Sequence, residues 1–131
     1  MMNSTIERLE AAVLEMLLRG DHPLLGVLRS QPASASVSSR ELTGWSFFTK
    51  FEVPPSAPRS TPPKFQVGDV EATVPGRELP LGLVVFIDDG RLLMLEGHTY
   101  GEAPWPETLD TFTLRYEREP RSLEHLGGGS T

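Results

Sequence analysis

The chain has 131 residues, a formal net charge of −6 and no cysteine. Disulfides, thiolate metal sites and cysteine nucleophiles are therefore excluded. No apolar run approaches the roughly 20 residues that span a bilayer, and the N-terminal MMNSTIERLE lacks the basic-then-apolar order of a signal peptide. These features predict one soluble, cytoplasmic domain without a membrane partner, since the chain is too short for two ordinary domains.

The first helix is predicted over residues 5–19, where apolar side chains recur at helical spacing on one face. Ser4 and Glu7 form a capping-box pattern at its start. A second, short helix is predicted from Pro23, because proline is favoured in the first turn of a helix. His22, or the aspartate before it, is expected near the cap.

Alternating apolar and polar residues predict strands in the rest of the chain. The predicted strands are residues 36–42, 45–53, 65–74, 83–87, 92–95 and 111–117. The dipeptide Asp89-Gly90 predicts a tight hairpin turn between the fourth and fifth of them, because both residues accept the positive φ angles that such a turn needs. Five prolines between residues 54 and 63 predict an extended loop.

This order of elements predicts an α+β fold, with two N-terminal helices packed on a curled antiparallel sheet of five to six strands. The domain is expected to cover residues 1–119, and residues 120–131 are expected to be a disordered or linker-like tail.

Phe86 and Val84 place apolar side chains on the side of their strand opposite Leu83, so both faces of the sheet centre need cover. We expect the sheet to curl and a homodimer to form; the proline-rich loop folding over the sheet is the alternative.

Acidic residues are concentrated between residues 96 and 119, where six acids face only two bases. A nucleic-acid partner is not expected, because phosphate binding needs a basic patch. An acidic strip favours a basic protein partner, and it is also compatible with a solvated surface that binds nothing. The predicted partner-binding residues are Glu96, His98, Tyr100, Glu102, Trp105 and Glu107.

Trp105 stands between two prolines, which stiffen its loop. A rigid aromatic side chain loses little entropy when it docks on a partner, so Trp105 is predicted to be the anchor of this surface. The alternative is that Trp105 folds back and seals the edge of the sheet.

Glu96 and His98 share one face of their strand. With Glu102 or His22 they could bind Zn²⁺ or Mn²⁺, or His98 could act as a general base. The sequence contains neither a Gly-x-Ser-x-Gly elbow nor a glycine-rich phosphate motif. We therefore expect neither catalysis nor a cofactor.

Three segments, SSRELTGWSFFTKFEVPPSAPR, FQVGDVEATVPG and FIDDGRLLMLEGHTYGEAPWPE, resemble a group of small uncharacterised bacterial proteins. In that group a strand ending in a Leu-Glu-x-Tyr-Thr-Tyr-Gly-Glu-like sequence leads into a Trp-Pro-Glu loop. The resemblance covers residues 20–117 and implies no catalytic role. In size, charge and α+β pattern the chain also resembles the small acidic immunity proteins of bacterial toxin systems.

These observations together predict a non-enzymatic protein-binding domain, of the kind that an immunity-type inhibitor of a basic bacterial protein would have. Two alternatives stay open. One is a small metal-dependent or hydrolytic enzyme that uses Glu96 and His98. The other is an engineered binding scaffold built on a natural bacterial fold, which the C-terminal GGGST suggests.

Overall fold

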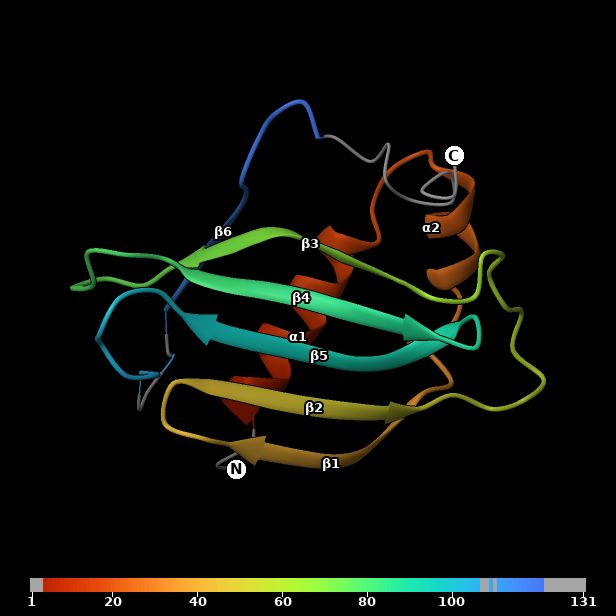
Figure 1. Ribbon diagram of the computed structural model, residues 1–131, viewed down its shortest axis with the longest axis horizontal. Helices are drawn as coiled ribbons and strands as arrows, with labels where there is room; N and C mark the ends of the chain where they lie inside the picture. The colour runs from red at the N-terminus through yellow and green to blue at the C-terminus, as the bar shows by residue number, and fades with distance from the viewer. Residues whose placement is uncertain (1–3, 107–108, 110, 122–131) are drawn as a thin grey trace.

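A computed structural model describes residues 4–106, 109 and 111–121. Two helices precede six strands along the chain. The elements are α1 (Ser4–Leu17), α2 (Pro23–Leu28), β1 (Ser36–Leu42), β2 (Ser46–Glu52), β3 (Phe65–Thr73), β4 (Leu81–Asp88), β5 (Arg91–Thr99) and β6 (Thr113–Tyr116). The strands form one antiparallel sheet in the order β1-β2-β5-β4-β3-β6. Figure 1 shows this sheet face-on, with α1 behind it. The predicted α+β class and the antiparallel sheet are confirmed.

The turn between β4 and β5 is the one that the sequence predicts. Asp89 and Gly90 have φ angles of 55° and 73°, and Asp88 pairs with Arg91 across the turn. Both central residues therefore occupy the left-handed region that a two-residue hairpin requires.

The core lies between α1 and one face of the sheet. Leu9, Val13 and Leu17 of α1 are fully buried, and α1 contacts β3 and β4. On the sheet, the buried side chains of β4 that share this side include Val85 and Ile87. The helical spacing in α1 and the strand alternation in β4 thus bring together the two apolar surfaces that need cover.

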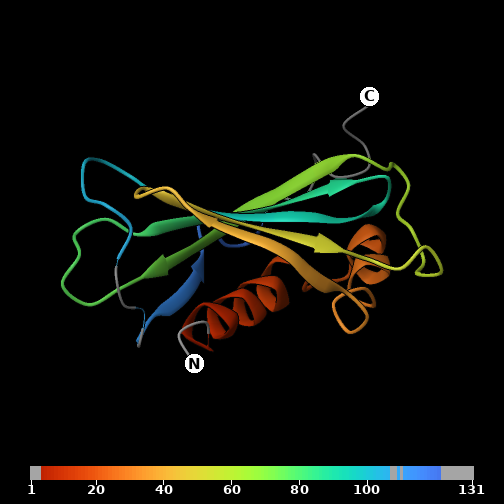
Figure 2. The same ribbon diagram turned by 90° about the horizontal axis from the view of Figure 1, so that it is seen from below.

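The opposite face of the sheet has no helix over it among the described residues. Figure 2 shows α1 and α2 on the same side of the twisted sheet, and the strand order does not close into a barrel. The proposed curling therefore does not cover the second face. Phe86 lies on this face and is half-buried, so it is not part of the core between α1 and the sheet.

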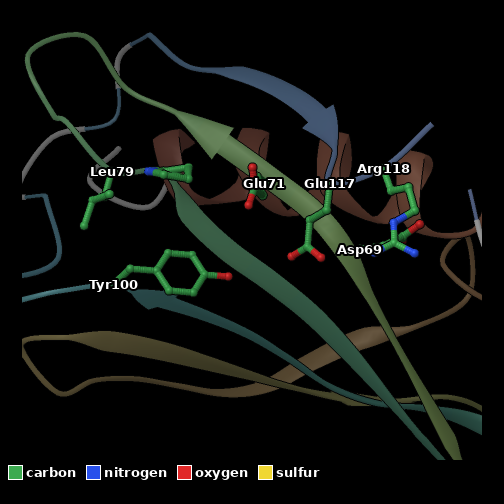
Figure 3. Close-up of a pocket in the computed structure, with 7 residues that line it drawn as sticks. Asp69, Glu71, Leu79, Tyr100, Glu117 and Arg118 are labelled. Atoms are coloured by element: carbon green, nitrogen blue, oxygen red, sulfur yellow. The ribbon is translucent and has the colours of Figure 1, made fainter.

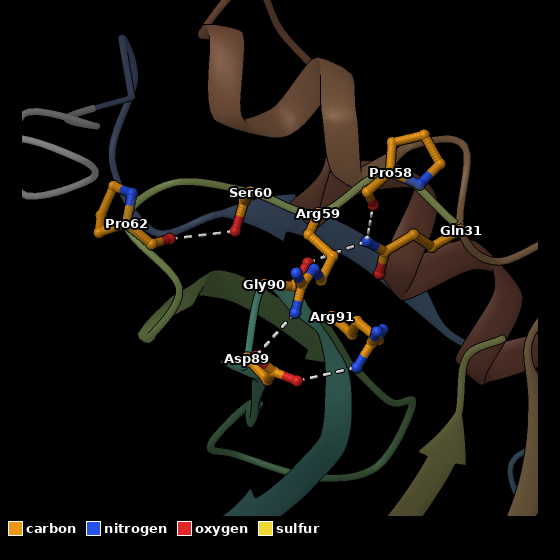
Figure 4. Close-up of polar contacts among 8 residues, drawn as sticks. All are labelled: Gln31, Pro58, Arg59, Ser60, Pro62, Asp89, Gly90 and Arg91. Atoms are coloured by element: carbon orange, nitrogen blue, oxygen red, sulfur yellow. Dashed lines mark hydrogen bonds and ion pairs between the residues drawn. The ribbon is translucent and has the colours of Figure 1, made fainter. Parts of the chain in front are cut away.

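The proline-rich loop does not cover that face either, because it is fixed to the tip of the β4–β5 hairpin (Figure 4). The side chain of Gln31 is fully buried, and its Nε2 donates to the carbonyl oxygens of Pro58 and Gly90 at 2.7 and 3.0 Å. The amide of Leu92 donates to Gln31 Oε1 at 2.9 Å. One side chain thereby joins the segment after α2, the loop and the hairpin.

The described fold continues past the expected boundary at residue 119. The guanidinium of Arg121 donates to both carboxylate oxygens of Asp69, at 2.7 and 2.9 Å. It also donates to the carbonyl oxygens of Leu17 and Arg19 at the end of α1. Arg121 therefore links the end of α1 to β3, and residues 122–131 of the predicted tail lie outside the described residues.

No helix in the described part of the chain is long and apolar enough to cross a membrane.

Candidate functional site

The uncovered side of the sheet, here called the open face, is defined by strand register. Thr49 of β2 lies on the helix side, because its hydroxyl donates to Glu10 of α1. The residues beside it in the strand point the other way. Residues that pair across neighbouring strands share a face of the sheet. The pairs across β2, β5 and β4 therefore place these residues on the open face: Phe48, Lys50, Val84, Phe86, Met94, Glu96 and His98.

The histidine and tyrosine of the predicted site lie together on the open face. The rings of His98 and Tyr100 meet edge to face with centroids 5.1 Å apart. They pass over Gly82 of β4, where a Cβ atom would lie 2.6 Å from the Tyr100 hydroxyl and 2.5 Å from His98 Nε2. The absence of a side chain at residue 82 therefore permits this position of both rings.

Tyr100 forms one wall of a cleft with a volume of about 620 Å³ (Figure 3). The cleft is lined by Asp69, Glu71, Leu79, Pro80, Tyr100, Glu117 and Arg118. It lies at the end of the open face where β3, β6 and the loop before β4 meet. Its walls combine an aromatic ring and two apolar side chains with three carboxylates and one arginine.

Two of the three carboxylates have cationic partners. Glu71 pairs with Arg115 at 3.0 Å, and Asp69 pairs with Arg121 at 2.7 Å. Burial raises the pKa of Glu117 above its ordinary value, and the negative charges of Glu71 and Asp69 raise it further, whereas His98 opposes the shift. Burial also raises the pKa of Tyr100, with Glu117 and Glu71 adding to the effect. Burial is the largest single cause of both shifts, and the neighbouring carboxylates act in the same direction.

Trp105 does not belong to the open face. Its side chain is 8% exposed, and its ring meets that of Phe47 edge to face with centroids 5.0 Å apart. A Cβ atom at Gly97 would collide with both rings. Trp105 therefore fills the core at the ends of β2 and β5, as in the alternative in which it folds back. Because a core indole is not accessible to a partner, Trp105 is not the anchor that the sequence predicts.

The loop that carries Trp105 is held at both sides. The amide of Trp105 donates to the carbonyl oxygen of Gly44 at 2.7 Å, and Arg77 Nη2 donates to that of Pro104 at 2.7 Å. Glu102 is exposed in the turn at the start of this loop. Glu107 lies outside the described residues.

A metal centre at Glu96 and His98 lacks ligands in the described part of the chain. His22 is the N-cap of α2, where its Nδ1 accepts from the amide of Leu24 at 3.2 Å. No three His, Cys, Asp or Glu residues among those described are grouped so that they could hold a metal ion. Since protein zinc sites use at least three side-chain ligands, the described residues give this alternative no support.

Only part of the open face can be predicted from the sequence. Strand alternation places Glu96 and His98 on one side of β5, and Asp69 and Glu71 on the polar side of β3. It does not reveal that β4, β3 and β6 follow one another at one end of the sheet, which is what brings Glu71 and Glu117 to Tyr100. That order depends on contacts between residues far apart in the chain.

Comparisons of the chain with protein-family models, with curated proteins and with solved structures gave no significant match.

Proposed function

We propose that this chain is a non-enzymatic protein-binding domain, an immunity-type inhibitor of a basic bacterial protein, and that it binds this protein through the open face of its sheet. The observation that carries the proposal is the open face itself. Large apolar and aromatic side chains occupy its centre, and no described helix or loop lies over them. Apolar surface with a polar border is typical of interaction sites in soluble proteins.

The residues predicted to bind a partner divide into two groups under this proposal. Glu96, His98 and Tyr100 lie on the open face or at its cleft, and Glu102 is exposed next to them. These residues remain proposed contacts. Trp105 instead supports the loop from the core.

Electrostatics supports a basic partner. The raised pKa of Glu117 reflects its burial and the nearby carboxylates, and a cation placed in the cleft would relieve that repulsion. Carboxylates around a binding surface also accelerate encounter with a protein of opposite charge.

Affinity capture with a matched control variant tests the function. Wild-type protein is immobilised beside the variant Glu96→Gln/Glu117→Gln and beside Glu15→Gln/Asp21→Asn, which removes the same charge from the exposed helical region. We expect a basic protein to be retained from a lysate of the source organism by wild type and by the helix variant, and to be lost from the open-face variant. The captured protein is then purified, and its association rate with the wild type should fall as salt rises.

Retention of no protein by the wild type would contradict the proposal. So would equal retention by all three proteins, because binding would then not involve the open face. An acceleration of any hydrolytic reaction that is lost in His98→Ala would favour the enzymatic alternative.

A further inference from the structure

An apolar strip crosses three neighbouring strands at the centre of the open face. Phe48 of β2 and Val84 of β4 flank Glu96 of β5 in one row, and Met94 and Phe86 are paired in the next row. We call Phe48, Val84, Phe86 and Met94 the apolar strip. Phe48, Phe86 and Met94 are half-buried, and Val84 is 8% exposed.

The apolar strip is covered only by its own members and the side chains beside them, within the described residues. Gly68 of β3 contributes to this packing, because a Cβ atom there would lie 2.9 Å from Val84 Cγ2. Strands are spaced about 4.8 Å apart, so three of them are about 10 Å wide. An α-helix with its side chains is about 10–12 Å in diameter. The apolar strip is therefore wide enough for one helix, the kind of element that covers the opposite face.

The charges around the apolar strip are mostly negative. Glu71 and Arg115 neutralise each other at 3.0 Å. Other charged side chains of this face include Glu41, Glu52, Glu96 and Glu117, and Lys50 and Arg118. A partner surface with lysine or arginine around an apolar centre would complement this arrangement.

We propose that the apolar strip is the docking site for a basic amphipathic helix of the partner protein. This inference rests on the proposed function and specifies the chemistry of the partner. A second copy of this chain is a less favourable occupant, because face-to-face docking would bring the same excess of carboxylates together from both sides. The basic helix instead covers the apolar side chains with its own and places cations near the carboxylates.

A titration followed by amide NMR tests this inference with defined peptides. The probe is a synthetic amphipathic helix of about 14 leucine and lysine residues, which is near the minimum length of an isolated helix. One control peptide has serine in place of every leucine and keeps the charge. A second has glutamate in place of every lysine and keeps the apolar face. We expect the leucine–lysine peptide alone to shift the amides of Phe48, Val84, Phe86 and Met94.

A matched pair of protein variants, with a third in reserve, makes the assignment specific. Phe86→Ser should weaken peptide binding by about tenfold or more, as truncation of a central contact does. Leu42→Ser removes a leucine that is 67% exposed on the helix side of β1 and should leave binding unchanged. If Phe86→Ser loses the dispersed amide spectrum of a folded protein, Met94→Gln serves as the second open-face variant.

Three results would overturn the docking inference. Equal binding of the serine–lysine peptide would show that charge alone is sufficient. Shifts confined to α1 or to the outer edge of β1 would place the site elsewhere. Broadening of the apolar-strip amides with rising protein concentration, together with a dimer in sedimentation equilibrium, would identify a second copy as the occupant.

Failure of this inference is distinguishable from failure of the proposed function. A basic protein that is captured equally by the wild type and by folded Phe86→Ser would leave protein binding intact and refute docking on the apolar strip. Peptide binding at the strip without any captured protein would instead refute the proposed function.

Discussion

The rings of Trp105 and Phe47 meet edge to face, with centroids 5.0 Å apart and an interplanar angle of 63°. Phe47 is 1% exposed and Trp105 is 8% exposed. The contact closes the core at the ends of β2 and β5, where a side chain at Gly97 would collide with both rings. It also holds the loop that follows Tyr100 against the core at Trp105, which is not among the residues that line the cleft.

Trp105→Ala should lower the free energy of unfolding by about 3–5 kcal/mol, the range found for truncation of a buried tryptophan. The matched control is Trp45→Ala, because Trp45 is 56% exposed and surface substitutions change stability by about 0.5 kcal/mol or less. Urea unfolding of both variants measures the difference. Equal stability of the two variants would contradict the buried position of Trp105.

Gln31→Leu should destabilise the protein by about 2–4 kcal/mol. The substitution leaves the buried amide of Leu92 and the carbonyl oxygen of Pro58 without the partners that Gln31 provides, and each orphaned group costs about 1–3 kcal/mol. Hydrogen exchange at the amide of Leu92 should accelerate together with that at the amide of Gly90. Gln66→Leu, at an exposed position of β3, is the control and should leave exchange at both amides unchanged.

Gly82→Ala should destabilise the protein by about 1–3 kcal/mol, because the new methyl group forces His98 and Tyr100 away from β4. The same substitution at Gly26 should stabilise α2 by about 0.5–1 kcal/mol, since the nearest atom to a Cβ there is 3.6 Å away and alanine is the better helix former. Thermal unfolding of the two variants should show a lower melting temperature for Gly82→Ala and a higher one for Gly26→Ala than for wild type. Shifts in the aromatic proton resonances of Tyr100 should accompany only the change at Gly82.

Local patterns were sufficient to predict most elements of this fold. The strands, the Asp89-Gly90 turn and, in part, the N-terminal helical segment follow from periodicity, caps and turn residues, which act over a few positions in the chain. The alternation in β2 also places Phe47 inside and Phe48 on the opposite face, as observed. These signals are local, so one sequence is enough to detect them.

The tertiary features were less predictable for the same physical reason. Both helices lie on one side of the sheet and leave its other face without a helix, and no short pattern encodes that arrangement. Pro-Trp-Pro stiffens a loop equally well whether the indole faces solvent or the core, so the sequence left the position of Trp105 open. Gln31 carries no local signal, because its three partners come from residues 58, 90 and 92.

Glu117 should titrate above the ordinary glutamate pKa of 4.5, because burial and the charges of Glu71 and Asp69 disfavour its ionised form. Carboxyl-detected NMR measures this value directly. Glu71→Gln should lower the pKa of Glu117, and His98→Ala should raise it, since His98 lowers that pKa and Glu71 raises it. A midpoint that is the same in wild type and in Glu71→Gln would show that the two carboxylates do not share the cleft.

The same shift predicts how stability depends on pH. A raised pKa means that the folded state binds the Glu117 proton more tightly than the unfolded chain does, so this residue lowers the free energy of unfolding as the pH rises from about 4.5 through the folded pKa. Glu117→Gln removes that contribution. The variant should therefore match wild type below pH 4 and exceed it at pH 7, by a margin of about 0.5 kcal/mol or less as is usual for a surface position. Urea unfolding across this pH range measures the difference, with Glu15→Gln as the control. A variant that is less stable than wild type at pH 7 would mean that Glu117 gains more from a cationic neighbour such as Arg118 than it loses to burial and repulsion.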